Sequence, residues 1–288
     1  MKRRRIVLLF SSALLVLAAG ARFSQGDLSP HSVLDQPDKP FSGTLSPSVS
    51  PKPASSTRDE TPILTLAVVG DNRDGDEIYK KIISQVNESG ATFLAHVGDM
   101  VAHGYDGEWV VFKKIQTALN MPFYAAPGNH DVYAGRDPYQ KAMGSLYFSF
   151  NNSGWHFIFL DNARGLISDI QMSWLKSDLA KNKSQPMFIF MHQPPMSKFS
   201  THTMVGDSNQ PENARSFLDL IKPYNVQAIF SGHVHAFNDE LLENTRLIIS
   251  GGGGSPIYLP EFLGGFYHWL KVKVYPDRFE FEINKIEG

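Results

Sequence analysis

The chain has 288 residues, a formal net charge of -2 and no cysteine. Hydrophobic residues make up 42% of the sequence and charged residues 19%, which is enough apolar material for one large globular domain. The near-neutral charge argues against stable nucleic-acid binding. Without cysteine the chain has no disulfides, thiolate metal sites or cysteine nucleophiles, so a metal site must use His, Asp, Glu, Asn and water.

The first 21 residues have the pattern of a signal peptide. A basic start, Lys2 to Arg5, precedes an uncharged run from Ile6 to Ala19, and Ala19-Gly20-Ala21 fits a cleavage site. The uncharged run is short for a membrane span of about 20 residues, so we expect cleavage and export to the periplasm or the exterior. The alternative is an uncleaved N-terminus that anchors the protein, which is the only membrane contact that the sequence predicts.

Residues 22–60 are rich in Ser, Pro, Asp and Thr and show no hydrophobic period. This composition predicts a disordered linker. From Ile63 onward, short apolar runs alternate with segments of helical spacing. The alternation predicts that residues 61–288 form one α/β domain.

The first half of this domain alternates three strands with two helices. Short apolar runs predict strands at 63–69, 93–97 and 123–126. Apolar residues at helical spacing predict helices at 77–87 and 109–119.

The second half continues the alternation. Residues 147–150 and 155–160 are expected to form a hairpin across Asn151 to Gly154. The C-terminal segment 247–286 is expected to be mostly strand. Between the hairpin and this segment, a helix, a strand, a second helix and a second strand are predicted at 171–179, 186–191, 214–221 and 226–230.

Five of the predicted strands end in a polar residue that is able to bind a metal. Active sites of α/β sheets form at the carboxyl ends of strands, so neighbouring strands would bring these side chains together. Burying them unpaired would cost several kcal/mol each, which argues against a chance arrangement in a core. The five residues are Asp71, Asp99, Asn129, His192 and His233.

The chemistry of this set suits a pair of divalent ions, which needs a charged bridging ligand and neutral donors on each side. Asp99 is a candidate bridge because a carboxylate has two oxygens. His233 and His235 lie two residues apart just beyond a strand, so the two rings could turn to neighbouring metals. Such donors suit Mn, Fe, Zn, Ni or Mg, whose identity the sequence leaves open.

The order of the motifs resembles the calcineurin-like metallophosphoesterases. Trp155 to Asn162 and Met191 to Pro195 are also similar to segments of that family, and the resemblance covers residues 63–255. It implies a four-layer α/β/β/α sandwich of two mixed sheets flanked by helices. The motifs are Gly70-Asp71, Gly98-Asp99, Gly128-Asn129-His130-Asp131, Met191-His192 and Gly232-His233-Val234-His235.

Carried over to this chain, the resemblance implies two metal sites that share one carboxylate. The first metal would be bound by Asp71, Asp99 and His235. The second metal would be bound by Asp99, Asn129, His192 and His233.

The resemblance also implies the reaction, which is hydrolysis of a small phosphomonoester or phosphodiester by a metal-bound hydroxide. His130 would face the substrate, where it would either protonate the leaving oxygen or stabilise the phosphoryl charge. Asn129 would contact the substrate as well.

One motif departs from the family pattern. The family usually begins Asp-x-His, but the chain has Asp71-Asn72-Arg73, and a protonated arginine cannot bind a metal. The first site therefore lacks a donor unless Asp74 or a water replaces it. Arg73 would either hold a substrate phosphate oxygen or form a salt bridge with Asp74 or Asp76. In a second departure, residues 100–103 lack an acidic residue that many members carry, which leaves the partner of His130 open.

The remaining histidines and loops have less specific patterns. His96 and His156 lie inside predicted strands and are expected to be hydrogen-bonded in the core or sheet. His202 lies in the loop 197–211, which is either a mobile rim of the substrate site or an ordinary surface loop. Gly251 to Gly254 is expected to be a turn close to the metal-binding loops.

Two other functions remain open. Arg73 favours a degenerate phosphoesterase fold that acts as a binding protein, which metal analysis with a chromogenic phosphate substrate would distinguish. A metallohydrolase for a non-phosphate ester is the second alternative. The run Asn129-His130-Asp131 argues against it, and a substrate panel would decide.

Overall fold

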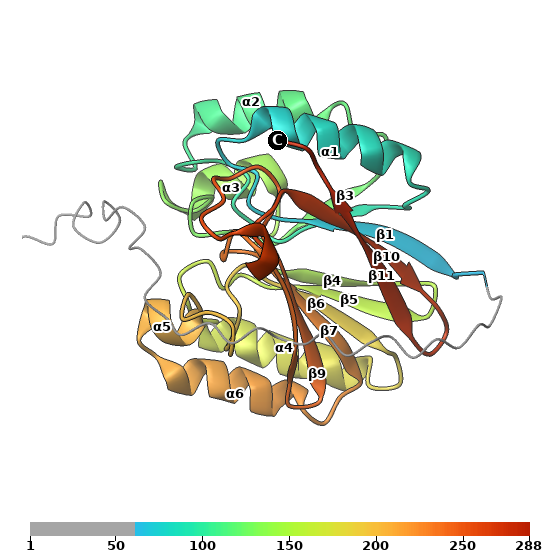
Figure 1. The fold of residues 1–288 in the computed structure, drawn as a ribbon. Helices are drawn as coiled ribbons and strands as arrows, with labels where there is room; N and C mark the ends of the chain where they lie inside the picture. The colour runs from blue at the N-terminus through green and yellow to red at the C-terminus, as the bar shows by residue number, and fades with distance from the viewer. Residues whose placement is uncertain (1–60) are drawn as a thin grey trace, which may run out of the picture. The chain divides into compact units, whose positions relative to one another are not determined.

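Two mixed β-sheets form the centre of residues 61–288, the part of the chain that this computed structural model describes (Figure 1). Helices α1 to α3 cover the outer face of one sheet, and α4 to α6 cover the outer face of the other. This confirms the predicted four-layer α/β/β/α architecture. The predicted signal peptide and linker lie outside the described residues.

The first sheet has the strand order β11-β10-β1-β2-β3. Strands β1, β2 and β3 run parallel, so their carboxyl ends meet at one edge, whereas β10 and β11 are antiparallel additions beside β1. The strands are β1 (Leu64–Val69), β2 (Leu94–His96), β3 (Phe123–Ala125), β10 (His268–Val274) and β11 (Phe279–Lys285).

The second sheet has the order β4-β5-β6-β7-β9-β8. The four central strands are parallel, and an antiparallel strand closes each edge. The strands are β4 (Phe148–Asn152), β5 (Trp155–Phe159), β6 (Met187–Phe190), β7 (Val226–Ser231), β8 (Phe237–Leu242) and β9 (Thr245–Ser250).

Five of the helices lie in connections between neighbouring parallel strands, whereas α3 lies in the connection from β3 of the first sheet to β4 of the second. Those on the first sheet are α1 (Asp76–Glu88), α2 (Asp106–Gln116) and α3 (Arg136–Met143). Those on the second sheet are α4 (Asp169–Lys181), α5 (Met204–Ser208) and α6 (Pro211–Ile221), and a short 3₁₀ helix, η2 (Glu261–Leu263), precedes β10. Within residues 61–288, no helix combines the length and apolar character that crossing a bilayer would require.

Strand β1 shows why these apolar runs become buried strands. Leu66 and Val68 point between the two sheets, while Ala67 and Val69 point to the helices outside. Because both faces of the strand are covered, an unbroken apolar run fits it better than a polar-apolar alternation. Aromatic rings fill the space between the sheets, with Phe159 stacked on Phe190 at 4.5 Å between ring centroids.

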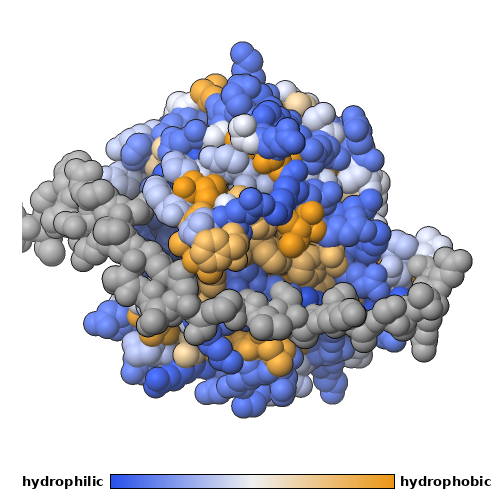
Figure 2. Space-filling model, viewed as in Figure 1, coloured by the Kyte–Doolittle hydropathy of each residue, from blue (hydrophilic) through white to orange (hydrophobic). Residues whose placement is uncertain are grey.

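The view in Figure 2 shows a surface that is mainly hydrophilic, with separate apolar patches near its middle. Two large apolar side chains of the segment before β10 are exposed, Tyr258 by 62% and Phe262 by 85%.

Apart from the short 3₁₀ helix η2, three elements were not predicted from the sequence. Helix α3 begins with Arg-Asp-Pro and is mostly polar, and α5 has only five residues, one of them a glycine. Strand β8 contains Asn238, Asp239 and Glu240, which are buried polar residues and do not follow an apolar pattern. All three depend on tertiary contacts that local sequence does not show.

Candidate metal centre

The loops that follow five strands meet at one place, as the sequence predicts. Asp71, Asp99 and Asn129 follow the parallel strands β1, β2 and β3 of the first sheet, and His192 and His233 follow β6 and β7 of the second. The loops bond to one another, since the N–H of Asp71 donates to Gly98 O at 2.9 Å and the N–H of Gly232 donates to His192 O at 2.9 Å. The site therefore forms where the loops at the carboxyl ends of the strands of both sheets meet.

The backbone at the strand ends turns these side chains into the site. Asp71 and Asp99 each have a φ of 60° and His233 has a φ of 69°, a left-handed conformation that costs a non-glycine residue roughly 1–2 kcal/mol. A Cβ on Gly98 would lie only 2.7 Å from Nδ1 of His192. The Gly-Asp motif thus gives a sharp turn and lets two loops approach closely.

His192 lies at the centre of the candidate second metal site. Its Nδ1 donates to Val97 O at 2.8 Å, so the ring, when it is neutral, has its lone pair at Nε2. That Nε2 lies 2.9 Å from Asn129 Oδ1, 3.3 Å from Asp99 Oδ1 and 3.2 Å from His233 Nδ1. The structure therefore brings all four residues assigned to the second site into one donor set.

The electrostatics of the site favour a cation. One ligand atom from each of Asp71, Asp99 and His192 lies within 4.8 Å of the others, and all three residues are buried. Burial raises the pKa of Asp71 to about 8, with Asp99 adding to the rise. Burial alone would lower the pKa of His192, but the charge of Asp99 raises it to about 9. Two buried carboxylates need nearby positive charge, which a divalent ion supplies.

His235 and Asp71 form the candidate first metal site together with Asp99. Nδ1 of His235 donates to Pro256 O at 2.9 Å, which leaves the Nε2 lone pair 3.6 Å from Asp71 Oδ1. Burial lowers the pKa of His235 to about 4, so the ring is neutral at pH 7. A neutral imidazole and two carboxylates fit a divalent cation without a change of protonation in the ring.

Arg73 lies where the family usually has a histidine. Its side chain is only 12% exposed, and Nη1 lies 3.2 Å from Asp74 Oδ2. Its buried Nε has no hydrogen-bond partner and lies 3.6 Å from Asp99 Oδ2. The salt bridge with Asp74, one of the two alternatives that the sequence left open, is therefore present, and the guanidinium also places a fixed positive charge beside the candidate bridging carboxylate.

His130 also faces Asp99. Its backbone N–H donates to Asp99 Oδ1 at 3.0 Å, and its Nε2 lies 4.0 Å from Asp99 Oδ2. Nδ1 donates to Ala102 O at 2.7 Å, which identifies the partner that the sequence left open. Burial lowers the pKa of His130, while Asp99 opposes the shift. Because Nδ1–H is engaged, His130 can donate from Nε2 only as an imidazolium.

One carboxylate and one amide side chain, to which the sequence analysis assigned no role, hold the loops in place. Asp131 accepts hydrogen bonds from the backbone N–H groups of residues 99–101 and of Gly128, at 2.8–3.1 Å. Asn162 Oδ1 accepts the N–H of His192 at 2.9 Å. Both residues lie in segments that resemble the family, and this resemblance was the only indication in the sequence that they belong to the site.

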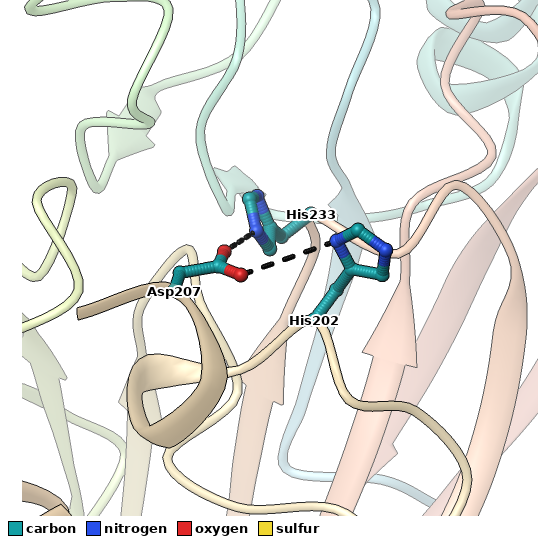
Figure 3. Close-up of side chains that lie close together, drawn as sticks. All are labelled: His202, Asp207 and His233. Atoms are coloured by element: carbon teal, nitrogen blue, oxygen red, sulfur yellow. Dashed lines mark hydrogen bonds and ion pairs between the residues drawn. The ribbon is translucent and has the colours of Figure 1, made fainter. Parts of the chain in front are cut away.

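The segment 197–211 reaches the site through α5. Asp207 accepts a hydrogen bond from Nε2 of His233, and His202 Nδ1 lies 4.0 Å from Asp207 Oδ1 (Figure 3). The sequence left this segment as a rim or a surface loop, and nothing in its spacing indicated a partner for Asp207.

The other expectations for histidines and turns are also met. His96 and His156 are buried, and each makes hydrogen bonds, His96 with Asn72 and His156 with Asp178. The turn at Gly251 to Gly254 runs beside the β1 loop, where the N–H of Gly253 donates to Gly70 O at 2.8 Å.

Comparison with known proteins identifies the family of this chain. The calcineurin-like phosphoesterase family matches residues 64–237, and the chain belongs to that family. The glycerophosphodiester phosphodiesterase GpdQ of Enterobacter lignolyticus is 28% identical over 152 residues, which are 48% of this chain and 54% of that protein. Purple acid phosphatase 23 of Arabidopsis thaliana is 34% identical over 158 residues, 46% of this chain and 33% of that protein.

The chain thus spans about half the length of the first relative and a third of the second. Among solved structures, a dimetal phosphatase from Danio rerio superposes with a TM-score of 0.63 at 13% identity, over 78% of this chain and 96% of that chain. At this identity the likeness supports the fold alone.

Proposed function

We propose that this protein hydrolyses a small phosphomonoester or phosphodiester with the help of two divalent cations. The observation that carries the proposal is the convergence of Asp71, Asp99 and His192, whose ligand atoms lie within 4.8 Å of one another in a buried site. Family membership and the phosphodiesterase and phosphatase names of its relatives support the reaction class.

The proposed ligands form two sets that share Asp99. Carboxylates, neutral imidazoles and one amide oxygen suit Mn, Fe, Zn, Ni or Mg. The first set is Asp71, Asp99 and His235, and the second is Asp99, Asn129, His192 and His233.

Three side chains would act on the substrate directly. When bound, the cations supply a nucleophile at neutral pH and neutralise phosphoryl charge. An imidazolium at His130 would hold a proton at Nε2 for the leaving oxygen or for a phosphoryl oxygen. Arg73 would bind a phosphate oxygen through its guanidinium. Asn129 would contact the substrate through the part of its amide that the cation leaves free.

A cavity of about 550 Å³ lies beside this centre, lined in part by Asp74, Asp76, Glu108 and Ala102. Its carboxylates would repel an anionic phosphoester. We therefore place the substrate at the metal-binding residues and not in this cavity.

A binding protein on the same fold is the second candidate, because the guanidinium of Arg73 lies 3.6 Å from the carboxylate that both cations would share. The two functions differ in turnover. The test is activity of the metal-loaded protein against p-nitrophenyl phosphate, bis(p-nitrophenyl) phosphate and p-nitrophenyl acetate. We expect metal-dependent turnover of a phosphate and none of the acetate. Bound metal without phosphate turnover would favour a binding protein, and preference for the acetate would indicate another metallohydrolase.

We further infer export from the pattern of residues 1–21. A basic start, an uncharged run and a small-residue site support a cleaved signal, followed by the linker of residues 22–60. An uncleaved N-terminus would instead anchor the protein to the membrane.

A further inference from the structure

The segment that carries Asp207 is anchored to the body of the domain. Helix α5 begins after Thr203, whose side-chain oxygen accepts the N–H of Gly206 at 3.3 Å. The N–H of Met204 donates to Pro194 O at 2.9 Å, and the Met204 side chain is fully buried in the apolar cluster between the second sheet and its helices. Packing therefore sets the position of Asp207.

The imidazole of His233 contacts Asp207 on one side (Figure 3) and His192, a candidate ligand of the second metal site, on the other. Its Nε2 donates to Asp207 Oδ2, while its Nδ1 lies 3.2 Å from Nε2 of His192. The Asp207 side chain is 29% exposed and that of His233 is 13% exposed, so solvent screens the contact only in part.

This arrangement fixes which nitrogen of His233 carries the proton. An ionised carboxylate can only accept a hydrogen bond, and a neutral imidazole has one N–H and one lone pair. The proton therefore lies at Nε2, and the lone pair at Nδ1 points to the donor set. A carboxylate in this position orients a metal-binding histidine and makes its nitrogen more basic.

We propose that Asp207 is a positioning residue of the second metal site, which fixes the tautomer and the ring plane of His233. The inference rests on the proposed function, because it requires His233 to bind a divalent cation. It also gives a role to α5, which lies outside the family motifs, because α5 supports the metal centre through Asp207.

His202, Asp207 and His233 could instead hold a cation of their own, because one ligand atom from each lies within 4.8 Å of the others. This use would require a lone pair at Nε2 of His233. A neutral ring cannot offer lone pairs at both nitrogens, so the three residues compete with the second site for His233. The larger donor set faces Nδ1, and we assign His233 to that set.

Calorimetric titration of the metal-stripped full-length protein with Mn²⁺ tests the inference without substrate. We expect Asp207→Ala to weaken the second site by about 10–100-fold. Asp207→Asn should weaken it less, because the amide oxygen still accepts the Nε2 proton. Asp219→Ala, which removes an exposed carboxylate from the neighbouring helix α6, is the matched control and should leave both affinities unchanged.

The possible results separate the inference from the proposed function. Unchanged affinity in a folded Asp207→Ala variant would overturn the inference and leave the metal centre standing, whereas a wild type that binds no Mn²⁺ would overturn both. His202→Ala should keep two ions, and loss of one would show that the three residues form a site themselves. If Asp207→Ala does not fold, NMR of the zinc-loaded wild type tests the inference by showing which nitrogen of His233 carries the proton. A proton at Nε2 agrees with the inference, and a proton at Nδ1 contradicts it.

Discussion

Replacing Arg73 by histidine should tighten the first metal site. As proposed, that site has three protein donors, whereas the second has four. The Arg73 side chain is only 12% exposed, and its fixed positive charge lies beside the carboxylate of Asp99 that both sites would share. We therefore expect the protein to hold one divalent ion tightly and to lose the other easily, and its activity to rise when metal is added.

The size of the effect follows from the contact between Arg73 and Asp99. At the 3.6 Å between Nε and Oδ2, unit charges attract by about 4–5 kcal/mol at an effective dielectric constant of about 20. A cation at Asp99 must share the carboxylate with the guanidinium and is repelled by it. If only a third of that energy, about 1.5 kcal/mol, opposes the cation, removing the charge tightens the site about tenfold. The added imidazole donor of Arg73→His should increase the gain further.

Calorimetric titration of metal-stripped wild type, Arg73→His and Arg73→Lys measures this directly. Arg73→Lys keeps the charge and adds no donor, so its first site should stay weak. If Arg73 binds substrate phosphate as proposed, Arg73→His should also raise KM, because the bidentate contact would be lost. Two equally tight sites in the wild type would contradict a weak first site and would show that another residue, such as Asp74, replaces the missing donor.

Three further predictions concern other parts of the account. His130→Ala should lower turnover by roughly 10²–10⁴-fold with metal content unchanged, and loss of metal as well would move His130 into the ligand set. Burial raises the pKa of Asp71 from 3.8 to about 8, so its contribution to stability is full below pH 4 and is lost as the pH rises through about 8. The Tm of the metal-stripped wild type should therefore fall between pH 5 and pH 9. The fall should be smaller for Asp71→Asn and for the wild type with Mn²⁺ bound. An equal fall in all three samples would be inconsistent with this role of Asp71. N-terminal sequencing of protein from the native host should find a start near Arg22, whereas an intact Met1 in a membrane fraction would show an anchor.

The sequence predicted the fold well because its signals are local. Apolar runs such as residues 63–69 mark strands covered on both faces, and helical spacing marks the segments between them. The order of the motifs along the chain resembles that of the calcineurin-like phosphoesterases, and this resemblance predicted the two-sheet architecture. The elements that were missed, α3, α5 and β8, are short or polar, and packing against distant residues determines them.

The candidate site could be predicted as a set of residues but not as a network. A glycine followed by an aspartate after an apolar run is visible in the sequence, and so is Gly-His-Val-His. The link from Asp207 to His233 is not visible, because the contact joins helix α5 to the loop after β7, 26 positions further along the chain. The approach of Arg73 to Asp99 also depends on how the β1 and β2 loops lie against each other.

The central claim is that two divalent ions share Asp99. Metal content and phosphoester turnover of Asp99→Asn, measured together beside Asp106→Asn, test it most directly, because the Asp106 side chain is 74% exposed and lies on α2. We expect Asp99→Asn to lose nearly all turnover and part of its metal, while Asp106→Asn retains both. Near-normal turnover of Asp99→Asn with two bound ions would show that the ions do not share Asp99.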